Sequence, residues 1–188
     1  MISILFARRD SIYKTLPDCD VWNIDRNALN WPGGCPIIAH PPCRAWGRLR
    51  HFAKPRDGER ELAIWSVNQV QKWGGVLEHP FASLLWPTMG LPTKGYRDIF
   101  GGYTLTVSQW WFGHRADKPT LLYIVGCSDT NLPAIPFKLG IPSHVVQSRK
   151  RLDHRPHITK AEREHTPLEM AKFLVAIAER CQNWTQKI

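Results

Sequence analysis

Short apolar runs that end at polar or proline residues restrict the folds open to the first part of this chain. Residues 2–7, 20–25 and 36–40 each have the length and composition of a buried strand. The third run stops at Pro41-Pro42, where the chain lacks the backbone donors that sheet pairing needs. A fourth run covers residues 76–78. Cys43 and Glu78 are therefore expected where two neighbouring strands end.

Helical spacing replaces these runs at two places. Residues 57–73 carry apolar side chains at helical intervals, and Thr166-Pro-Leu-Glu169 matches a capping box that opens a helix reaching Cys181. Between the helices, residues 104–112 and 120–125 predict an antiparallel hairpin, and residues 81–102 predict a loop. The order of elements predicts an α/β fold with a mostly parallel sheet, which binds ligands at the carboxyl ends of its strands.

Composition narrows the class of protein. The 188 residues are enough for one domain, and 25 Lys and Arg against 16 Asp and Glu give a formal charge of +9, which favours an anionic partner. Apolar runs stay well short of the roughly 18 residues that a membrane helix needs. The five cysteines lack a CxxC pair, which predicts neither disulfides nor a zinc finger. We therefore expect a cytoplasmic protein without a membrane partner or a metal.

Three segments together resemble a known family. They are His40-Pro-Pro-Cys43-Arg-Ala-Trp-Gly47, Leu77-Glu-His-Pro80, and Gln109-Trp-Trp-Phe-Gly-His114 continuing to Gly126. These segments are similar to motifs of the DNA cytosine-5 methyltransferases, especially small phage and prophage members with HPPC and ENP-type signatures. The resemblance implies one Rossmann-like, S-adenosylmethionine-dependent domain over residues 1–188, in the host cytoplasm if a phage encodes it. Residues 127–165 would then be a reduced basic loop in place of a target-recognition domain.

The chemistry of cytosine methylation explains the need for a cysteine and a carboxyl group. Carbon 5 is a poor nucleophile until a thiolate adds at carbon 6, and a carboxyl group at ring N3 stabilises the developing charge. The resemblance implies that Cys43 is the nucleophile and that Glu78, 35 residues later, is the N3 partner. Arginines near Cys43 are expected to lower the pKa of its thiol.

The cofactor turn departs from the family pattern. The usual glycine-rich turn after the first strand reads Phe6-Ala-Arg-Arg-Asp-Ser11 here, and the family's Gln and Asn next to the catalytic pair are Arg44 and His79. The resemblance assigns S-adenosylmethionine to Phe6, Ala7, Asp25 and Pro41, with Asp25 on the ribose.

DNA contacts are expected from basic side chains around the site, either on a duplex with a flipped base or on a single strand. The candidates are Arg44, Arg48, Arg50, Arg115, Lys118, Arg149 and Arg151. Trp46 is the candidate to fill or line the gap that a flipped base leaves. A family motif rich in basic residues is placed at residues 112–126, and residues 147–151 are a competing placement.

Three other interpretations stay open. The chain could be a DNA-binding remnant of the fold without chemistry, or it could modify a base in phage DNA with another cofactor. A zinc deaminase is the third, with His40, Cys43, His51 and His79 as ligands and Glu78 as general base. The oligomeric state stays open as well.

Overall fold

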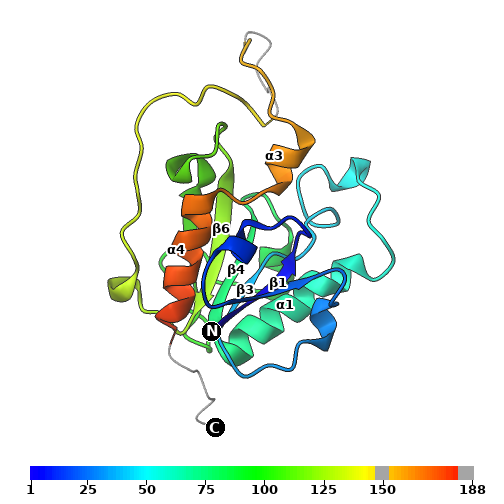
Figure 1. Ribbon diagram of the computed structural model, residues 1–188, viewed down its shortest axis with the longest axis vertical. Helices are drawn as coiled ribbons and strands as arrows, with labels where there is room; N and C mark the ends of the chain where they lie inside the picture. Colours follow the sequence, from blue (N-terminus) through cyan, green and yellow to red (C-terminus); the bar gives the residue numbers. More distant parts are fainter. Residues whose placement is uncertain (147–152, 182–188) are drawn as a thin grey trace.

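A six-stranded mixed sheet forms the centre of the computed structural model, which describes residues 1–146 and 153–181 (Figure 1). The strands are β1 (Ile2–Ala7), β2 (Cys19–Asn23), β3 (Ile37–Ala39), β4 (Gly75–Pro80), β5 (Tyr103–Ser108) and β6 (Pro119–Val125). Their order is β2-β1-β3-β4-β6-β5. The first four run parallel, and β6 runs antiparallel to both β4 and β5. The predicted α/β class, the mostly parallel sheet and the hairpin are confirmed.

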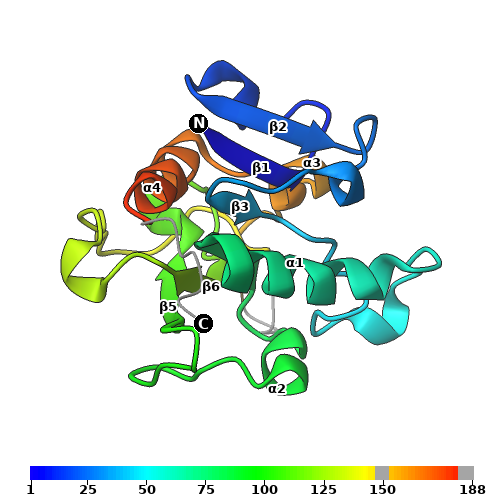
Figure 2. The same ribbon diagram turned by 90° about the horizontal axis from the view of Figure 1, so that it is seen from below.

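Helices cover both faces of this sheet. Side chains alternate along each strand, so Ile38 and Val76 pack under α4 (Leu168–Glu179), whereas Ile37 and Leu77 pack under α1 (Glu59–Trp73). Figure 2 shows α4 and α1 on opposite sides of β3. Each strand of the centre therefore buries both rows of its side chains, which accounts for the nearly continuous apolar runs in the sequence.

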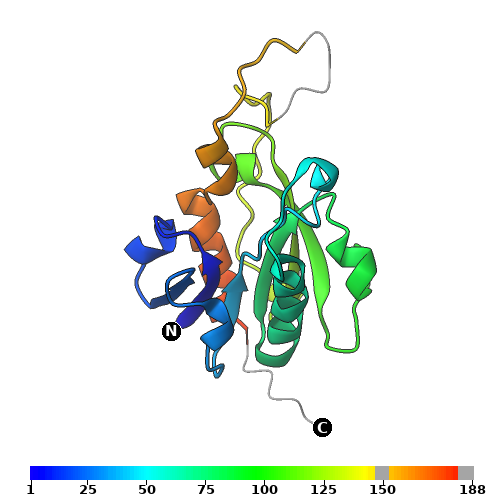
Figure 3. The ribbon, with the colours of Figure 1, turned by 90° about the vertical axis from the view of Figure 1, so that its right-hand side faces the viewer.

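The carboxyl ends of β1–β4 form the edge that matters for a ligand. The chain passes from β1 to β2 on one side and returns to β3 on the other, which creates a switch point between β1 and β3. The short helix α3 (Lys160–Glu164) and the segment that follows Cys43 both lie at this edge (Figures 1 and 3). The remaining α-helix, α2 (Leu85–Met89), packs beside α1.

Two strand boundaries differ from the prediction for local reasons. The β2 strand ends at Asn23 because the Asn23 Oδ1 accepts hydrogen bonds from the backbone N–H groups of Asp25 and Arg26. Residues 109–112 were expected to continue a strand but form a 3₁₀ turn. Ser108 Oγ accepts a hydrogen bond from the N–H of Trp110 at the start of this turn, and Gly113 ends it with a positive φ of 95°. Asp25 therefore lies beyond its strand.

The capping box predicted at Thr166 is wrong. Helix α4 begins after Pro167, which has no side-chain cap, whereas Thr159 and Glu162 form a capping box at the start of α3. Both sites carry the same Thr-x-x-Glu pattern, but the N-cap of α4 is Pro167, one residue after Thr166. Within the described ranges, no helix is long and apolar enough to cross a membrane.

Candidate active site

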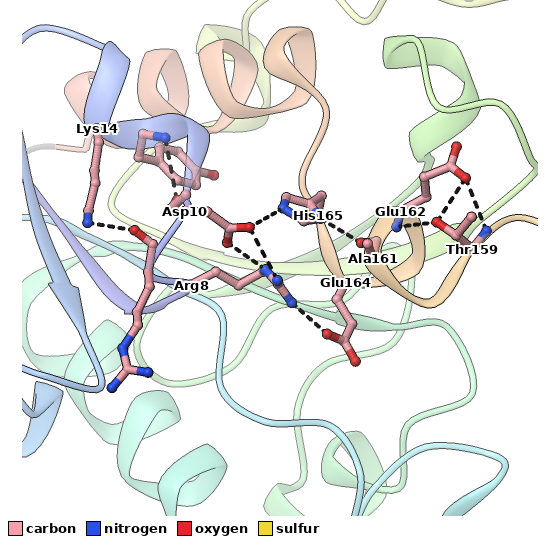
Figure 4. A network of polar contacts seen from close by, with 11 residues as sticks. Arg8, Asp10, Lys14, Thr159, Ala161, Glu162, Glu164 and His165 are labelled. Carbon is pink, nitrogen blue, oxygen red and sulfur yellow. Dashed lines mark hydrogen bonds and ion pairs between the residues drawn. The ribbon is translucent and has the colours of Figure 1, made fainter.

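The turn after β1 achieves its sharp bend without glycine. Phe6 adopts φ 60°, a left-handed conformation that costs a side-chain-bearing residue about 1 kcal/mol, and the register against β2 shifts between Leu5 and Ala7. Arg8 then pairs with Asp10 at 2.9 Å and with Glu164 at 2.5 Å (Figure 4). These contacts tie the turn to the end of α3.

A cavity of about 440 Å³ opens beside this turn, at the carboxyl ends of β1 and β2. Its lining includes Phe6, Ile24, Leu62, Pro42, Arg44 and Glu59. Apolar walls next to a few charged groups are typical of small-ligand sites, and the volume is in their range. Pro42 and Arg44 flank Cys43 in the chain, although Cys43 itself is not part of the lining.

The predicted cofactor residues are only partly brought to this cavity. Phe6 lines it, whereas Ala7, Pro41 and Asp25 do not. Asp25 is exposed and pairs with Arg9 at 2.7 Å, and Asn23 contributes to the lining in its place. Asp25, the predicted ribose ligand, thus lies outside the cavity, because β2 ends two residues earlier than expected.

Glu78 is held by hydrogen bonds on both oxygens. His40 Nδ1 lies 3.2 Å from Oε2, and Gln109 Nε2 donates to Oε1 at 3.1 Å. The side chain is 16% exposed. Burial alone would raise the pKa of this carboxyl, but the hydrogen bond from His40 and the charge of Lys118 outweigh it and lower the pKa to about 2. Glu78 is therefore a carboxylate at neutral pH.

Cys43 is half-buried on the loop that follows β3. Burial raises the pKa of its thiol, the negative charge of Glu78 raises it further, and the positive charge of Lys118 opposes both effects. The prediction that neighbouring arginines lower this pKa is wrong. Arg44 turns away and forms a bidentate pair with the buried carboxylate of Glu59. At rest, Cys43 is a thiol.

The structure brings Cys43, Glu78 and Lys118 within range of one another's charges and leaves the other candidates apart. Arg115 pairs with Glu162 at 2.6 Å on the surface of α3. Arg48 and Arg50 lie on the segment after Cys43, and Arg48 is exposed. The candidates Arg149 and Arg151, and the competing motif placement at 147–151, lie outside the described residues.

The prediction for Trp46 is wrong, and His79 lies away from the site. Trp46 is fully buried, with its Nε1 donating to the carbonyl of Arg60, so it cannot enter DNA. Phe52, six residues later, is 86% exposed. His79 stacks against Trp86 on the opposite face of the sheet, where burial lowers its pKa to about 4. The hydrogen bonds to Glu78 come from His40 and Gln109, and His79 acts on Glu78 through its charge alone.

The zinc interpretation finds no support in the geometry. Across residues 1–146 and 153–181, no three His, Cys, Asp or Glu side chains converge as metal ligands, and this includes His40, Cys43, His51 and His79. His40 instead contacts Glu78 and Tyr13.

Sequence reasoning missed three residues of this site: Tyr13, His40 and Gln109. His40 and Gln109 each opened a quoted motif, so a signal existed, but His40 was considered only as a zinc ligand and Gln109 was given no role. Tyr13 gave no signal, because it reads as an ordinary core position and is 1% exposed.

Comparison of the chain with protein-family models, curated proteins and solved structures finds no match.

Proposed function

We propose that this protein is a DNA cytosine-5 methyltransferase with a Rossmann-like, S-adenosylmethionine-dependent fold. The observation that carries the proposal is the pairing of Cys43 and Glu78. Glu78 lies in the second half of β4, and Cys43 lies on the loop that follows the adjacent parallel strand β3. The charge of Glu78 acts on the thiol of Cys43. Neither residue type at this position is needed to stabilise a buried sheet edge, whereas both are needed to add a nucleophile to a pyrimidine.

The resting protonation states of the pair support a balanced first step. Cys43 begins as a thiol and Glu78 as a carboxylate. When Sγ bonds to carbon 6, the thiol proton leaves and ring N3 gains one, with Glu78 positioned to carry it between them. The ring becomes an enamine that is nucleophilic at carbon 5. Lys118 offsets the charge of Glu78 at the thiol, which favours loss of the thiol proton.

The cavity beside the β1 turn fits an adenosine ligand with a zwitterionic end. Phe6, Ile24 and Leu62 offer apolar surface for a base, while the exposed Arg56 and Asp57 offer opposite charges. When bound, S-adenosylmethionine supplies an electrophilic methyl group. Pro42 and Arg44, which flank Cys43 in the chain, line the cavity, and this is why we place the cofactor next to the Cys43 loop.

The segment that follows Cys43 supports DNA as the partner. Residues 44–60 hold six Lys and Arg against two carboxylates, and the exposed Phe52 lies among them. A base inside a duplex cannot reach Cys43, and flipping it out costs a few kcal/mol that phosphate contacts and an inserted side chain would offset. The exposed Phe52 takes the role that the sequence assigned to Trp46.

Mass spectrometry of DNA tests the proposal. Incubation with protein and S-adenosylmethionine is expected to add methyl groups to cytosine, and Cys43→Ser is expected to abolish the gain. Cys35→Ser is the matched control, because Cys35 is also half-buried but lies near Ser3 at the opposite end of β3. A mass gain that survives Cys43→Ser would exclude the covalent mechanism.

The raised pKa of Cys43 favours one alternative, a DNA-binding protein of the same fold without chemistry. Calorimetry separates the two. Absence of S-adenosylmethionine binding together with salt-sensitive DNA binding would support the alternative, and cofactor binding would support the enzyme.

A further inference from the structure

We propose that Tyr13 and His40 are positioning residues that hold Glu78 as a fixed hydrogen-bond acceptor, with His40 in its Nδ1–H tautomer. The inference deepens the proposed function and rests on it for the substrate. The three side chains form a chain of contacts: Tyr13 Oη lies 3.0 Å from His40 Nε2, and His40 Nδ1 lies 3.2 Å from Glu78 Oε2.

Three separate segments assemble this chain on one face of the sheet. Tyr13 comes from the 3₁₀ turn Ile12–Thr15 after β1, His40 follows β3 directly, and Glu78 lies in β4. His40 continues the side-chain row of Ile38, and Glu78 continues that of Val76, both of which pack in the core under α4. Tyr13 is packed in the same core and is 1% exposed.

The two ends of the chain determine the proton position on His40. Burial and the charge of Glu78 raise the pKa of Tyr13, so its hydroxyl keeps its proton. A hydroxyl at this depth stabilises the fold only if that proton is donated, and Nε2 of His40 is the acceptor in reach. Nε2 then carries the lone pair, and the ring proton sits on Nδ1, where it points at the Glu78 carboxylate.

Gln109 anchors the other oxygen of Glu78. Its Nε2 donates to Oε1 at 3.1 Å and also lies 3.2 Å from Thr120 Oγ1, which fixes the amide against β6. Both oxygens of Glu78 therefore have one donor from the protein and keep lone pairs for a ligand. The other charged or titratable groups that act on Glu78 are Lys118 and His79.

Apart from the moment at which it carries the thiol proton to N3, a fixed carboxylate of this kind accepts hydrogen bonds and does not donate them. Cytosine protonated at N3 offers two donors on one edge, N3–H and the exocyclic amine. Uracil and thymine place a carbonyl oxygen where that amine would be, so one Glu78 oxygen would face another acceptor. An unpaired buried acceptor costs about 1–3 kcal/mol, which corresponds to roughly 5- to 150-fold discrimination. The chain from Tyr13 would thus maintain selectivity for cytosine.

Nitrogen NMR of histidine-labelled protein at pH 8 tests the tautomer without any enzymatic activity. The His40 signal, assigned by its loss in His40→Gln, is expected to show a proton on Nδ1 and a lone pair on Nε2. In Tyr13→Phe the signal is expected to move toward the Nε2–H form. Tyr103→Phe is the matched control, because the buried Tyr103 hydroxyl has no hydrogen-bond partner in the described chain. An Nε2–H or doubly protonated His40 in the unmodified protein would overturn the proposal.

Methyl transfer supplies the second readout. Tyr13→Phe is expected to lower kcat with little change in KM for DNA, to alter the pH profile, and to reduce the preference for cytosine over uracil at least fivefold. If Tyr13 serves packing alone, Tyr13→Phe would leave the tautomer and the preference unchanged, and that result would contradict the inference. If no variant and not even the unmodified protein transfers methyl groups, the proposed function fails, while the NMR result still decides the role of Tyr13 and His40.

Discussion

Replacing Glu78 with Gln should reduce stability in a pH-dependent way. The pKa of Glu78 falls from an ordinary 4.5 to about 2 in the folded protein, despite the opposing effect of burial, because His40 and Lys118 favour the charged form. One pKa unit corresponds to about 1.4 kcal/mol, so ionised Glu78 contributes about 3 kcal/mol at pH 7. This contribution is complete above pH 4.5 and is lost as the pH falls toward 2.

Urea unfolding of both proteins at pH 7 and pH 3 measures the effect. Between these pH values the stability advantage of the unmodified protein over Glu78→Gln is expected to shrink by about 2 kcal/mol. Glu169→Gln is the control, because it removes an exposed carboxylate paired with Lys172 and should change stability by less than about 1 kcal/mol. An advantage that stays constant or grows on acidification would refute the assignment of Glu78 as a carboxylate held by His40 and Lys118.

Three further predictions concern Cys43, Phe52 and Trp46. Because the charge of Glu78 raises the pKa of Cys43, Glu78→Gln should speed alkylation of Cys43 by iodoacetamide at pH 7.5, and an unchanged or slower rate would contradict this. Phe52→Ala should weaken duplex DNA binding roughly tenfold, as measured by fluorescence anisotropy. Tyr96 is also exposed, and Tyr96→Ala should leave DNA binding unchanged. Equal effects of the two substitutions would argue against insertion of Phe52 into DNA. Trp46→Ala should cost about 3–5 kcal/mol in urea unfolding, and a loss below 1 kcal/mol would mean that Trp46 is not a core residue.

The strands and the long helices were predictable because their burial leaves a periodic trace in the sequence. Residues 2–7 were predicted with the correct ends, and α1 begins two residues after its predicted start. The errors occur where one side-chain hydrogen bond decides the backbone, as at Asn23, where β2 stops, and at Ser108, where β5 becomes a 3₁₀ turn. Such contacts depend on three-dimensional positions that a pattern of apolar residues does not encode.

The candidate site was predictable in its two central residues and not in their surroundings. Cys43 and Glu78 follow from strand ends, but the direction of the Cys43 pKa depends on where Arg44 points, and Arg44 binds Glu59 on the following helix. Tyr13 joins the site from a position that looks like core. The sequence shows that arginines lie close to Cys43 in the chain, but only the fold determines which carboxylate each arginine pairs with.

The most direct test of the account is a search for a covalent adduct between Cys43 and a pyrimidine. In 5-fluorocytosine a fluorine replaces the hydrogen on carbon 5. After Cys43 attacks carbon 6 and the methyl group is transferred, there is no proton to remove from carbon 5, so the bond to Cys43 is not broken and the protein should stay attached to the DNA. Intact mass spectrometry with S-adenosylmethionine should detect this adduct, and peptide mapping should place it on Cys43. Absence of an adduct under conditions where DNA and cofactor both bind, or attachment at another cysteine, would contradict the account.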